Sequence, residues 1–459
     1  MHASITPGRF NFISFQRIAG NLLFLILAIY SIVYAAERVS YIDSAWQFFC
    51  RVNNESFLFP SGRFGVFLSE IPLFIAVKLH LPFSVLVYVF SLSYIILYYL
   101  IWRLCTYTFK NPVAGLAIIL SSVTGIRESF LHPVTETHQC IVFSFLLWAL
   151  INYDFGRPWL KTTLACALTV FILFVHPIGV FTIGFVLLLF MIEKKAFRNY
   201  LPWLMLTIIL LVSMWRFFSP TDPYDADQFA HLKNSGGIFD LTQNFTFNFL
   251  KIHFTHFYWL PVLAFIITTA ALAFQKEWLK LSALTVSVAA YLIIACITFS
   301  QGDSSIMMER IFLPAFFMVN LVFADLLLKQ TKLNKWIPMI LAVFFMVNGI
   351  HYINAGCLMY KKRVIYLDKL VKEGIAQGHD KYILPDAKAD QERILVPWAF
   401  GTETLVYSKF KYGTSISITI ESETCPPGNC RVTSLLCLPV NELNSHYFQL
   451  SNAPYVKLK

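Results

Sequence analysis

The sequence contains eleven apolar runs, most of them close to the length that crosses a lipid bilayer, which is about 20 residues with a range of about 17–25. The runs lie at 18–36, 84–102, 112–126, 139–152, 160–175, 177–192, 200–217, 256–274, 279–299, 311–328 and 336–355. Hydrophobic residues make up 57% of the chain and charged residues 14%, a balance that excludes a water-soluble globule. We therefore predict a polytopic α-helical membrane protein with about eleven transmembrane helices.

Lysine and arginine fall in alternate loops, which predicts the orientation of these helices. The clusters are Arg9 and Arg17; Arg103 and Lys110; Arg157 and Lys161; Lys194, Lys195 and Arg198; Lys276 and Lys280; and Lys329, Lys332 and Lys335. With eleven spans and the N-terminus inside, all of them face the cytoplasm. The net charge of +10 is then loop charge that sets orientation, and we expect no nucleic-acid partner.

The opposite, extracytoplasmic side receives the long loops at 37–83 and 218–255. Residues 64–79 in the first loop are fairly apolar but contain Glu70, Pro72 and Lys78. We interpret them as an interfacial helix rather than a span, because a further crossing would turn every later basic cluster outward.

The composition changes after the last apolar run, so we divide the chain into a membrane core, 1–356, and a small extracytoplasmic α/β domain, 357–459. In the latter, KKRVIYLDKLVKEGIAQG predicts an amphipathic helix, and KYILP, ILVPW and SISITI predict short strands. Cys425 and Cys430 flank a Pro-Pro-Gly turn and are candidates for a disulfide, with Cys437 as a competing partner.

Ionisable residues gather in the predicted outward loops, and such groups near a membrane often mark functional cavities. Asp43 is either a solvated acid that caps a helix or a general base at a cleft on the membrane surface. Glu309 and Arg310 directly precede an apolar run. They are either a polar flank with an internal ion pair, or Arg310 is an anion clamp for a lipid-linked phosphate.

The outward motif HPVTETH holds His132, Glu136 and His138, and it also has two interpretations. It is either a loop that ends at a helix N-terminus capped by a threonine, or a site that binds phosphate or a divalent metal (Mg, Mn or Zn). In the second interpretation Glu136 and His138 are the metal ligands. His176 sits at the next outward turn.

This layout resembles the GT-C superfamily of integral-membrane glycosyltransferases, which includes the protein mannosyltransferases and the aminoarabinose transferases. The resemblance rests on Asp43 shortly after the first span, on the interfacial helix that follows it, and on the late-helix pattern Glu309-Arg310-Ile311-Phe312-Leu313-Pro314. It also rests on a core that ends in an outward domain. The sequence departs from the family because Ser44 follows Asp43 where an Asp-Glu pair is common, and because only Asp225-Ala226-Asp227 has DxD spacing.

The resemblance implies a transferase that moves a sugar from a polyprenyl-phosphate donor to an acceptor glycan, lipid or protein. Asp43 would act as catalytic base or orient the acceptor. The residues expected to bind the donor phosphate are Arg310, His132, Arg127 and Arg63. The protein would lie in the bacterial inner membrane, or in the ER membrane of a eukaryote, with its active face outward and in contact with membrane lipid.

Two other functions remain open. The chain could be a non-catalytic GT-C-like subunit that scaffolds a complex through a protein partner bound at 357–459. It could also be a transporter or flippase, although eleven spans without internal repeats and few ionisable residues near mid-membrane argue against that.

Overall fold

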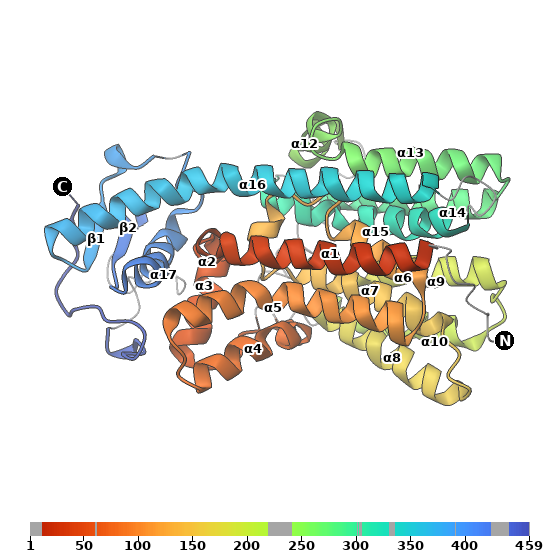
Figure 1. Cartoon of the computed structure of the whole chain (residues 1–459), viewed down its shortest axis with the longest axis horizontal. Coiled ribbons are helices and arrows are strands. Elements are labelled where there is room, and N and C mark those ends of the chain that lie inside the picture. The colour runs from red at the N-terminus through yellow and green to blue at the C-terminus, as the bar shows by residue number, and fades with distance from the viewer. Residues whose placement is uncertain are drawn as a thin grey trace.

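The computed structural model describes residues 12–59, 62–218, 241–300, 302, 305–329, 336–390, 392–423 and 440–458. They form a bundle of long helices with a small sheet at one end (Figure 1). The candidate disulfide cysteines Cys425 and Cys430, their competitor Cys437 and the 225–227 motif lie outside the described residues.

Each of the eleven predicted runs corresponds to a helix. These helices are α1 (Phe12–Val33), α5 (Phe83–Arg103), α6 (Pro112–Ser121), α7 (Glu136–Asn152), α8 (Pro158–Val175), α9 (Gly179–Lys194), α10 (Tyr200–Phe218), α13 (Trp259–Phe274), α14 (Trp278–Thr298), α15 (Ser305–Lys329) and α16 (Trp336–Gln377). Among the described residues, seven are long and apolar enough to cross a membrane: α1, α5 with the π turn that extends it, α8, α10, α14, α15 and α16. The other four have 10 to 17 residues, so the count of eleven crossings stays a prediction.

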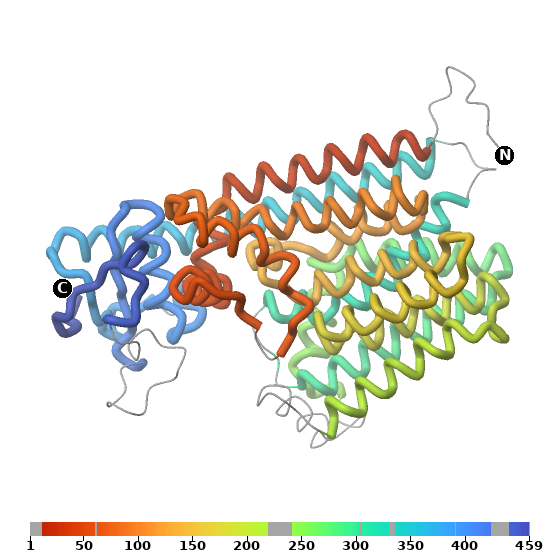
Figure 2. Tube along the Cα trace, turned by 90° about the horizontal axis from the view of Figure 1, so that it is seen from below, coloured from red at the N-terminus to blue at the C-terminus, as the bar shows by residue number. Residues whose placement is uncertain are grey.

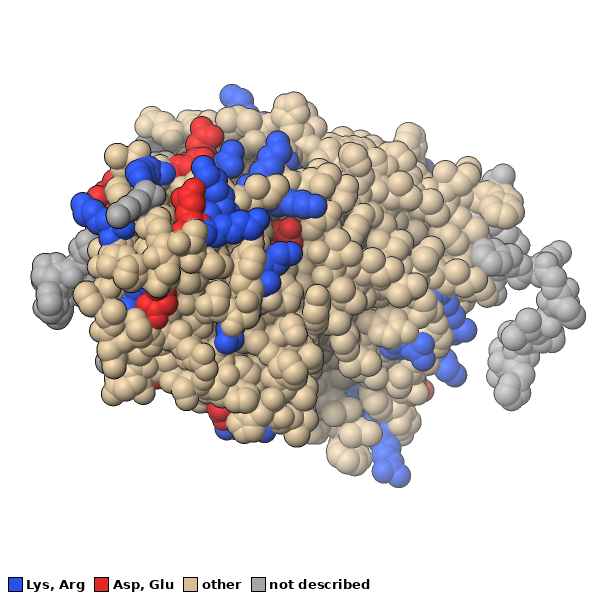
Figure 3. All heavy atoms as spheres, turned by 60° about the vertical axis from the view of Figure 1, so that its left-hand side comes forward, with Lys and Arg blue, Asp and Glu red and all other residues tan. Residues whose placement is uncertain are grey.

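The loops alternate between the two ends of the bundle. We call the end at which the sheet lies the sheet end, and the opposite end, near the start of α1, the far end (Figures 1 and 2). Five lysines line one hollow of about 790 Å³ at the far end. Lys194, Lys280 and Lys329 belong to α9, α14 and α15, and Lys110 and Lys276 lie in the segments before α6 and α14. In Figure 3 charged side chains gather over the sheet end and again toward the far end, with a mostly uncharged surface between them. This is the surface pattern of a membrane-embedded helix bundle.

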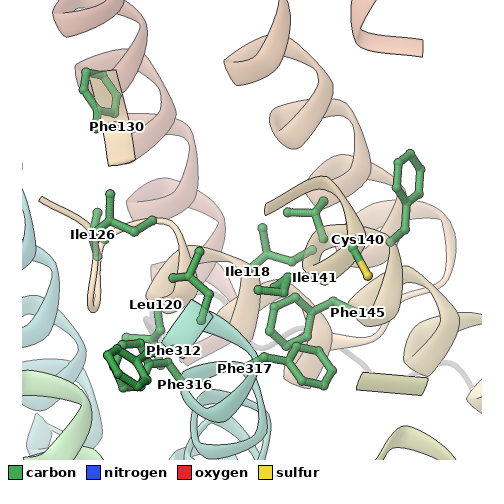
Figure 4. Close-up of a cluster of buried hydrophobic side chains, with 14 of the residues drawn as sticks. Ile118, Leu120, Ile126, Phe130, Cys140, Ile141, Phe145, Phe312, Phe316 and Phe317 are labelled. Atoms are coloured by element: carbon green, nitrogen blue, oxygen red, sulfur yellow. The ribbon is translucent and has the colours of Figure 1, made fainter. Parts of the chain in front are cut away.

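Helix α15 forms the centre of the bundle, and its side chains from Ile306 to Leu327 are almost all buried. Its phenylalanines pack among side chains of α6 and α7, and the rings of Phe317 and Phe145 lie 4.6 Å apart (Figure 4). The buried Asn320 donates hydrogen bonds to the hydroxyls of Ser121 and Thr124, so the amide donors inside this apolar core are satisfied. A helix that is apolar on every side suits such an enclosed position, because none of its faces has to meet water.

The first predicted outward loop contains three short helices, α2 (Ala35–Val39), α3 (Ile42–Asn54) and α4 (Phe67–Lys78). Helix α4 matches the predicted interfacial segment in extent. A buried ion pair between Arg51 of α3 and Glu70 of α4 joins these two helices, and Glu70 also accepts a hydrogen bond from the Leu58 N–H. The predicted loop at 218–255 includes a further helix, α12 (Phe245–His253).

The C-terminal part differs from the sequence prediction in two respects. The amphipathic segment that starts at residue 361 is not a separate helix, because α16 continues without a break for 42 residues, about 63 Å. The predicted boundary at 356 therefore falls inside a helix. The predicted strand ILVPW is wrong: Pro397–Ala399 form a 3-10 turn, in which Pro397 loses nothing by lacking an N–H.

The sheet has three short parallel strands in the order β2-β1-β3. They are β1 (Lys381–Leu384), β2 (Ser417–Ile420) and β3 (Val456–Lys457). The first two correspond to the predicted strands KYILP and SISITI. Helix α17 (Phe400–Tyr412) connects this part to the bundle, because it packs against β2 on one side and against α3 on the other.

Candidate functional site

A cavity of about 1210 Å³ lies at the sheet end of the bundle. Its walls come from α3, the loop before α7, α9, α10, α14 and α15, and from Val396 and Trp398 of the C-terminal part. Six predicted site residues line it: Asp43, Arg63, His132, Glu136, His176 and Arg310. These residues come from separate segments of the chain and meet around one space that side chains do not fill.

His132 connects the predicted base to the predicted anion clamp. Its Nε2 lies 3.3 Å from Asp43 Oδ2, and its Nδ1 lies 3.4 Å from Arg310 Nη1. The imidazole is 2% exposed, whereas 41% of the Asp43 side chain is exposed, toward the cavity. Because Arg310 can only donate, its contact fits a neutral imidazole with an unprotonated Nδ1. The Thr135 hydroxyl lies 3.2 Å from the same Nδ1, and Nε2 contacts Asp43 without hydrogen-bond geometry.

The electrostatics favour the same protonation states. Burial and the nearby Arg310 guanidinium lower the pKa of His132, and the Asp43 carboxylate only partly opposes them. Burial alone would raise the pKa of Asp43, but the contact with His132, the charge of that ring when it is protonated, and the charge of Arg310 outweigh burial and lower the pKa. At neutral pH the site therefore presents an ionised Asp43 beside a neutral His132.

Cationic groups outnumber acids on the described cavity wall. Three guanidinium groups line it, those of Arg63, Arg216 and Arg310, against the two carboxylates of Asp43 and Glu136. Arg63 and Glu136 form a loose ion pair at 3.7 Å. Much of the remaining wall is apolar and comes from α9, α10, α14 and α15. Such a wall suits a ligand with an anionic group and an apolar tail.

Glu309 is separated from the cavity although it is next to Arg310 in sequence. Its carboxylate accepts hydrogen bonds from the backbone N–H groups of Arg127, Glu128 and Ser129, at 2.9–3.1 Å. It thus fixes the loop that leads to His132. The guanidinium of Arg127 lies 4.2 Å from the centre of the Phe257 ring and does not line the cavity. Of the interpretations left open for this pair, an internal ion pair does not describe Glu309, whose carboxylate is bound by backbone N–H groups.

The two predicted metal ligands face different spaces. Glu136 lines the main cavity, whereas His138, two residues along α7, lines a small separate cavity of about 50 Å³. Among the described residues, no group of three or more His, Cys, Asp or Glu side chains is placed to hold a metal ion. The assignment of Glu136 and His138 as metal ligands and the metal requirement both stay predictions.

His176 lies at the turn between α8 and α9, where its Nδ1 accepts a hydrogen bond of 3.1 Å from the Ile178 N–H. Burial, together with Arg63, Arg310 and Arg216, lowers its pKa well below the usual value. An accepting Nδ1 requires the neutral ring, so the hydrogen bond and the charges act in the same direction.

Sequence reasoning missed two residues of the cavity wall. Arg216 is the one basic residue near the outward end of the 200–217 run, a signal that was available. Trp398 belongs to the segment that was interpreted as a strand of a separate domain, so its place on the cavity wall could not be foreseen.

Fold and site together define the class as a polytopic helical membrane protein with a cavity at one end of its bundle, lined by apolar side chains and a group of ionisable ones. Compared with models of known protein families, with curated proteins and with solved structures, the chain gives no match.

Proposed function

We propose that this protein is a GT-C-type glycosyltransferase that moves a sugar from a polyprenyl-phosphate donor to an acceptor at the extracytoplasmic face of the membrane. The observation that carries this proposal is the single cavity lined by Asp43, His132 and Arg310, with direct contacts from His132 to the other two. The sequence resemblance implies the same roles for Asp43 and Arg310.

The proposed donor has an anionic head and an apolar tail, and the cavity offers both kinds of wall. Arg310, with Arg63 and Arg216 on the same wall, would bind the phosphate oxygens. Apolar residues such as Phe181, Val212 and Ile294 would contact the first isoprene units. The ring of Trp398 is available to stack on a sugar face.

The chemistry is a substitution at the anomeric carbon of the donor sugar. An acceptor hydroxyl or amine forms the new bond to that carbon, the bond from the carbon to the phosphate oxygen breaks, and the polyprenyl phosphate leaves with the bonding pair. Arg310 stabilises the negative charge on the leaving phosphate. Asp43 accepts the acceptor's proton as the new bond forms, because an amine or hydroxyl becomes acidic at that stage. His132 holds the carboxylate of Asp43 toward the cavity.

The membrane orientation follows from the charges. The lysine-lined hollow at the far end would lie in the cytoplasm and the cavity on the opposite side. A bacterial inner membrane, or the ER membrane in a eukaryote, is the proposed location.

The test is the binding of undecaprenyl phosphate to the purified full-length protein, measured by native mass spectrometry. We expect specific binding that Arg310→Gln weakens at least tenfold. Arg103→Gln, which changes an exposed arginine at the far end, is the matched control and should leave binding unchanged. Binding that is equal in both variants, or no binding at all, would overturn the proposal and favour a non-catalytic subunit.

A further inference from the structure

The backbone at Ile42, the residue before Asp43, is strained. Its φ is +24°, in a region that a β-branched residue rarely adopts. Such a conformation is energetically unfavourable and persists only where the surrounding structure enforces it. Ile42 is 7% exposed and begins α3. The contacts that enforce this conformation therefore also fix the position of Asp43.

One of these contacts comes from a residue 361 positions away in the sequence. The Ile42 N–H donates a hydrogen bond of 2.7 Å to Glu403 Oε1 of α17, and Glu403 is fully buried. The second oxygen of the same carboxylate is paired with the guanidinium of Arg363 on α16. A buried carboxylate with a cation on one oxygen and a backbone N–H on the other is a fully satisfied and rigid acceptor.

The same arginine also holds the preceding peptide group. Arg363 Nη1 donates to the carbonyl oxygen of Ser40 at 3.3 Å and to the Tyr360 hydroxyl at 2.5 Å. Between these backbone contacts, the Tyr41 ring packs on the rings of Tyr360 and His132, at centroid distances of 4.9 and 5.6 Å. The segment 40–42 is thus held at three points: the carbonyl of Ser40, the ring of Tyr41 and the N–H of Ile42.

We propose that Glu403 is a positioning residue of the cavity, and that it acts through Ile42. It holds Ile42 in the strained conformation from which Asp43 reaches His132, with Arg363 fixing the carboxylate. The C-terminal part of the chain then completes the site, to which it also contributes Val396 and Trp398. The catalytic meaning of this alignment rests on the proposed transferase function, whereas the structural constraint on residues 40–43 does not.

Hydrogen–deuterium exchange of the full-length protein tests the constraint without reference to activity. The variants are Glu403→Gln and the milder Glu403→Asp, which keeps a charge for Arg363 but draws the carboxylate back from Ile42. We expect faster exchange in peptides covering 40–46, with the protection of α17 and β2 retained. Glu421→Gln, which changes a surface acid paired with Lys457, is the control. If 40–46 exchanges as in the wild type, or loosens only together with α17, Glu403 merely docks the C-terminal part and the proposal is wrong.

A rescue experiment tests the role of the strained φ. Glycine adopts positive φ without the steric penalty, so Ile42→Gly should restore part of what Glu403→Asp loses. In a turnover assay that follows release of undecaprenyl phosphate from a lipid-linked sugar, we expect Glu403→Asp to lower kcat about tenfold to a hundredfold with little change in KM. The double variant should recover several-fold; a defect that Ile42→Gly leaves untouched contradicts the proposal.

The experiments distinguish a failure of the transferase proposal from a failure of the positioning role of Glu403. If the wild type releases no undecaprenyl phosphate but exchange at 40–46 responds to Glu403 as expected, the transferase function fails and the constraint stands. If the wild type is active and neither exchange nor kcat responds to Glu403→Asp, the transferase function stands and the positioning role is wrong.

Discussion

The charged residues at the two ends of the bundle are organised in opposite ways. At the far end the ammonium of Lys280 lies within 3.3 Å of three carboxylates, those of Glu193, Glu277 and Asp325. At the sheet end the acid Asp43 has a neutral histidine as its neighbour, and 41% of its side chain is exposed toward a large cavity. The far-end carboxylates pair directly with Lys280 and Lys329, whereas Asp43 contacts an imidazole at the edge of a large cavity. We infer that the first arrangement serves stability and the second serves a ligand.

The largest effect that would sharpen this contrast is expected from Asp43→Asn. The amide keeps the shape but cannot accept a proton, so turnover of a lipid-linked sugar should fall about 100-fold to 10,000-fold. The thermal midpoint of the protein in detergent should change little, because Asp43 is partly exposed. Asp154→Asn, an exposed acid in the loop between α7 and α8, is the control. Equal turnover in the two variants would remove Asp43 from the chemistry.

At the far end we expect the reverse: a substitution there should lower stability rather than ligand binding or turnover. Lys280→Met leaves three carboxylates facing one another without their shared cation, which should destabilise the fold by about 3–5 kcal/mol. Lys329, which also contacts Asp325 and Glu193, offsets part of this loss. Unfolding of the purified protein in detergent measures the effect, and the exposed Lys276→Met is the control. Weaker binding of undecaprenyl phosphate with unchanged stability would break the comparison between the two ends.

Glu309 and Arg310 repeat the contrast in two adjacent residues. Glu309→Gln places an amide NH₂ among three backbone donors, so at least one of them loses its acceptor, at a cost of about 2 kcal/mol. Arg310→Gln removes a group that faces the cavity and should affect ligand binding more than folding. Both variants are measured by thermal unfolding and by undecaprenyl phosphate binding. Glu309→Gln should show the larger loss of stability, and Arg310→Gln the larger loss of binding. The same ranking in both assays would show that the two residues act as one unit.

The sequence predicted the helices well because each apolar run must be buried in lipid or protein. The alternation of the loops also predicted that one end of the bundle holds four of the site residues, Asp43, His132, Glu136 and Arg310, because alternate loops of a bundle meet there. It could not separate Glu309 from Arg310, or Glu136 from His138. Neighbouring helical positions point about 100° apart, and only packing decides which of them faces a cavity.

The role of the C-terminal part was beyond the reach of sequence patterns for a related reason. The contact between Glu403 and Ile42 joins residues 361 positions apart, and its acceptor is an acid in α17, a helix whose residues from Phe400 to Ser408 are all buried. A positive φ at Ile42 contradicts the preference of isoleucine, so no local signal predicts it. The interpretation of ILVPW as a strand failed because its apolar pattern outweighed Pro397, which starts a 3-10 turn.

The smallest predicted effect concerns pH and His176. The pKa of this histidine is well below its usual value of 6.5 in the folded protein, chiefly because of burial and then because of Arg63, Arg310 and Arg216. As pH falls below 6.5 the unfolded chain takes up a proton that the folded chain does not, so the folded state loses stability. A single such group lowers stability by roughly 1 kcal/mol between pH 6.5 and 5.5. Stability continues to fall as pH decreases from 6.5 to the pKa of His176 in the folded protein.

The measurement is the thermal midpoint in detergent at pH 7.5, 6.5 and 5.5, for the wild type and for His176→Gln. Glutamine can accept the hydrogen bond from the Ile178 N–H but does not titrate, so the midpoint of the variant should fall less with acidification. His132 shares the direction of the shift, which leaves a residual slope in the variant. His379→Gln, at an exposed position beside the sheet, should keep the full wild-type slope. If His176→Gln keeps that slope too, protonation of His176 does not oppose folding, and the inferred effect of burial and of Arg63, Arg310 and Arg216 on this ring is wrong.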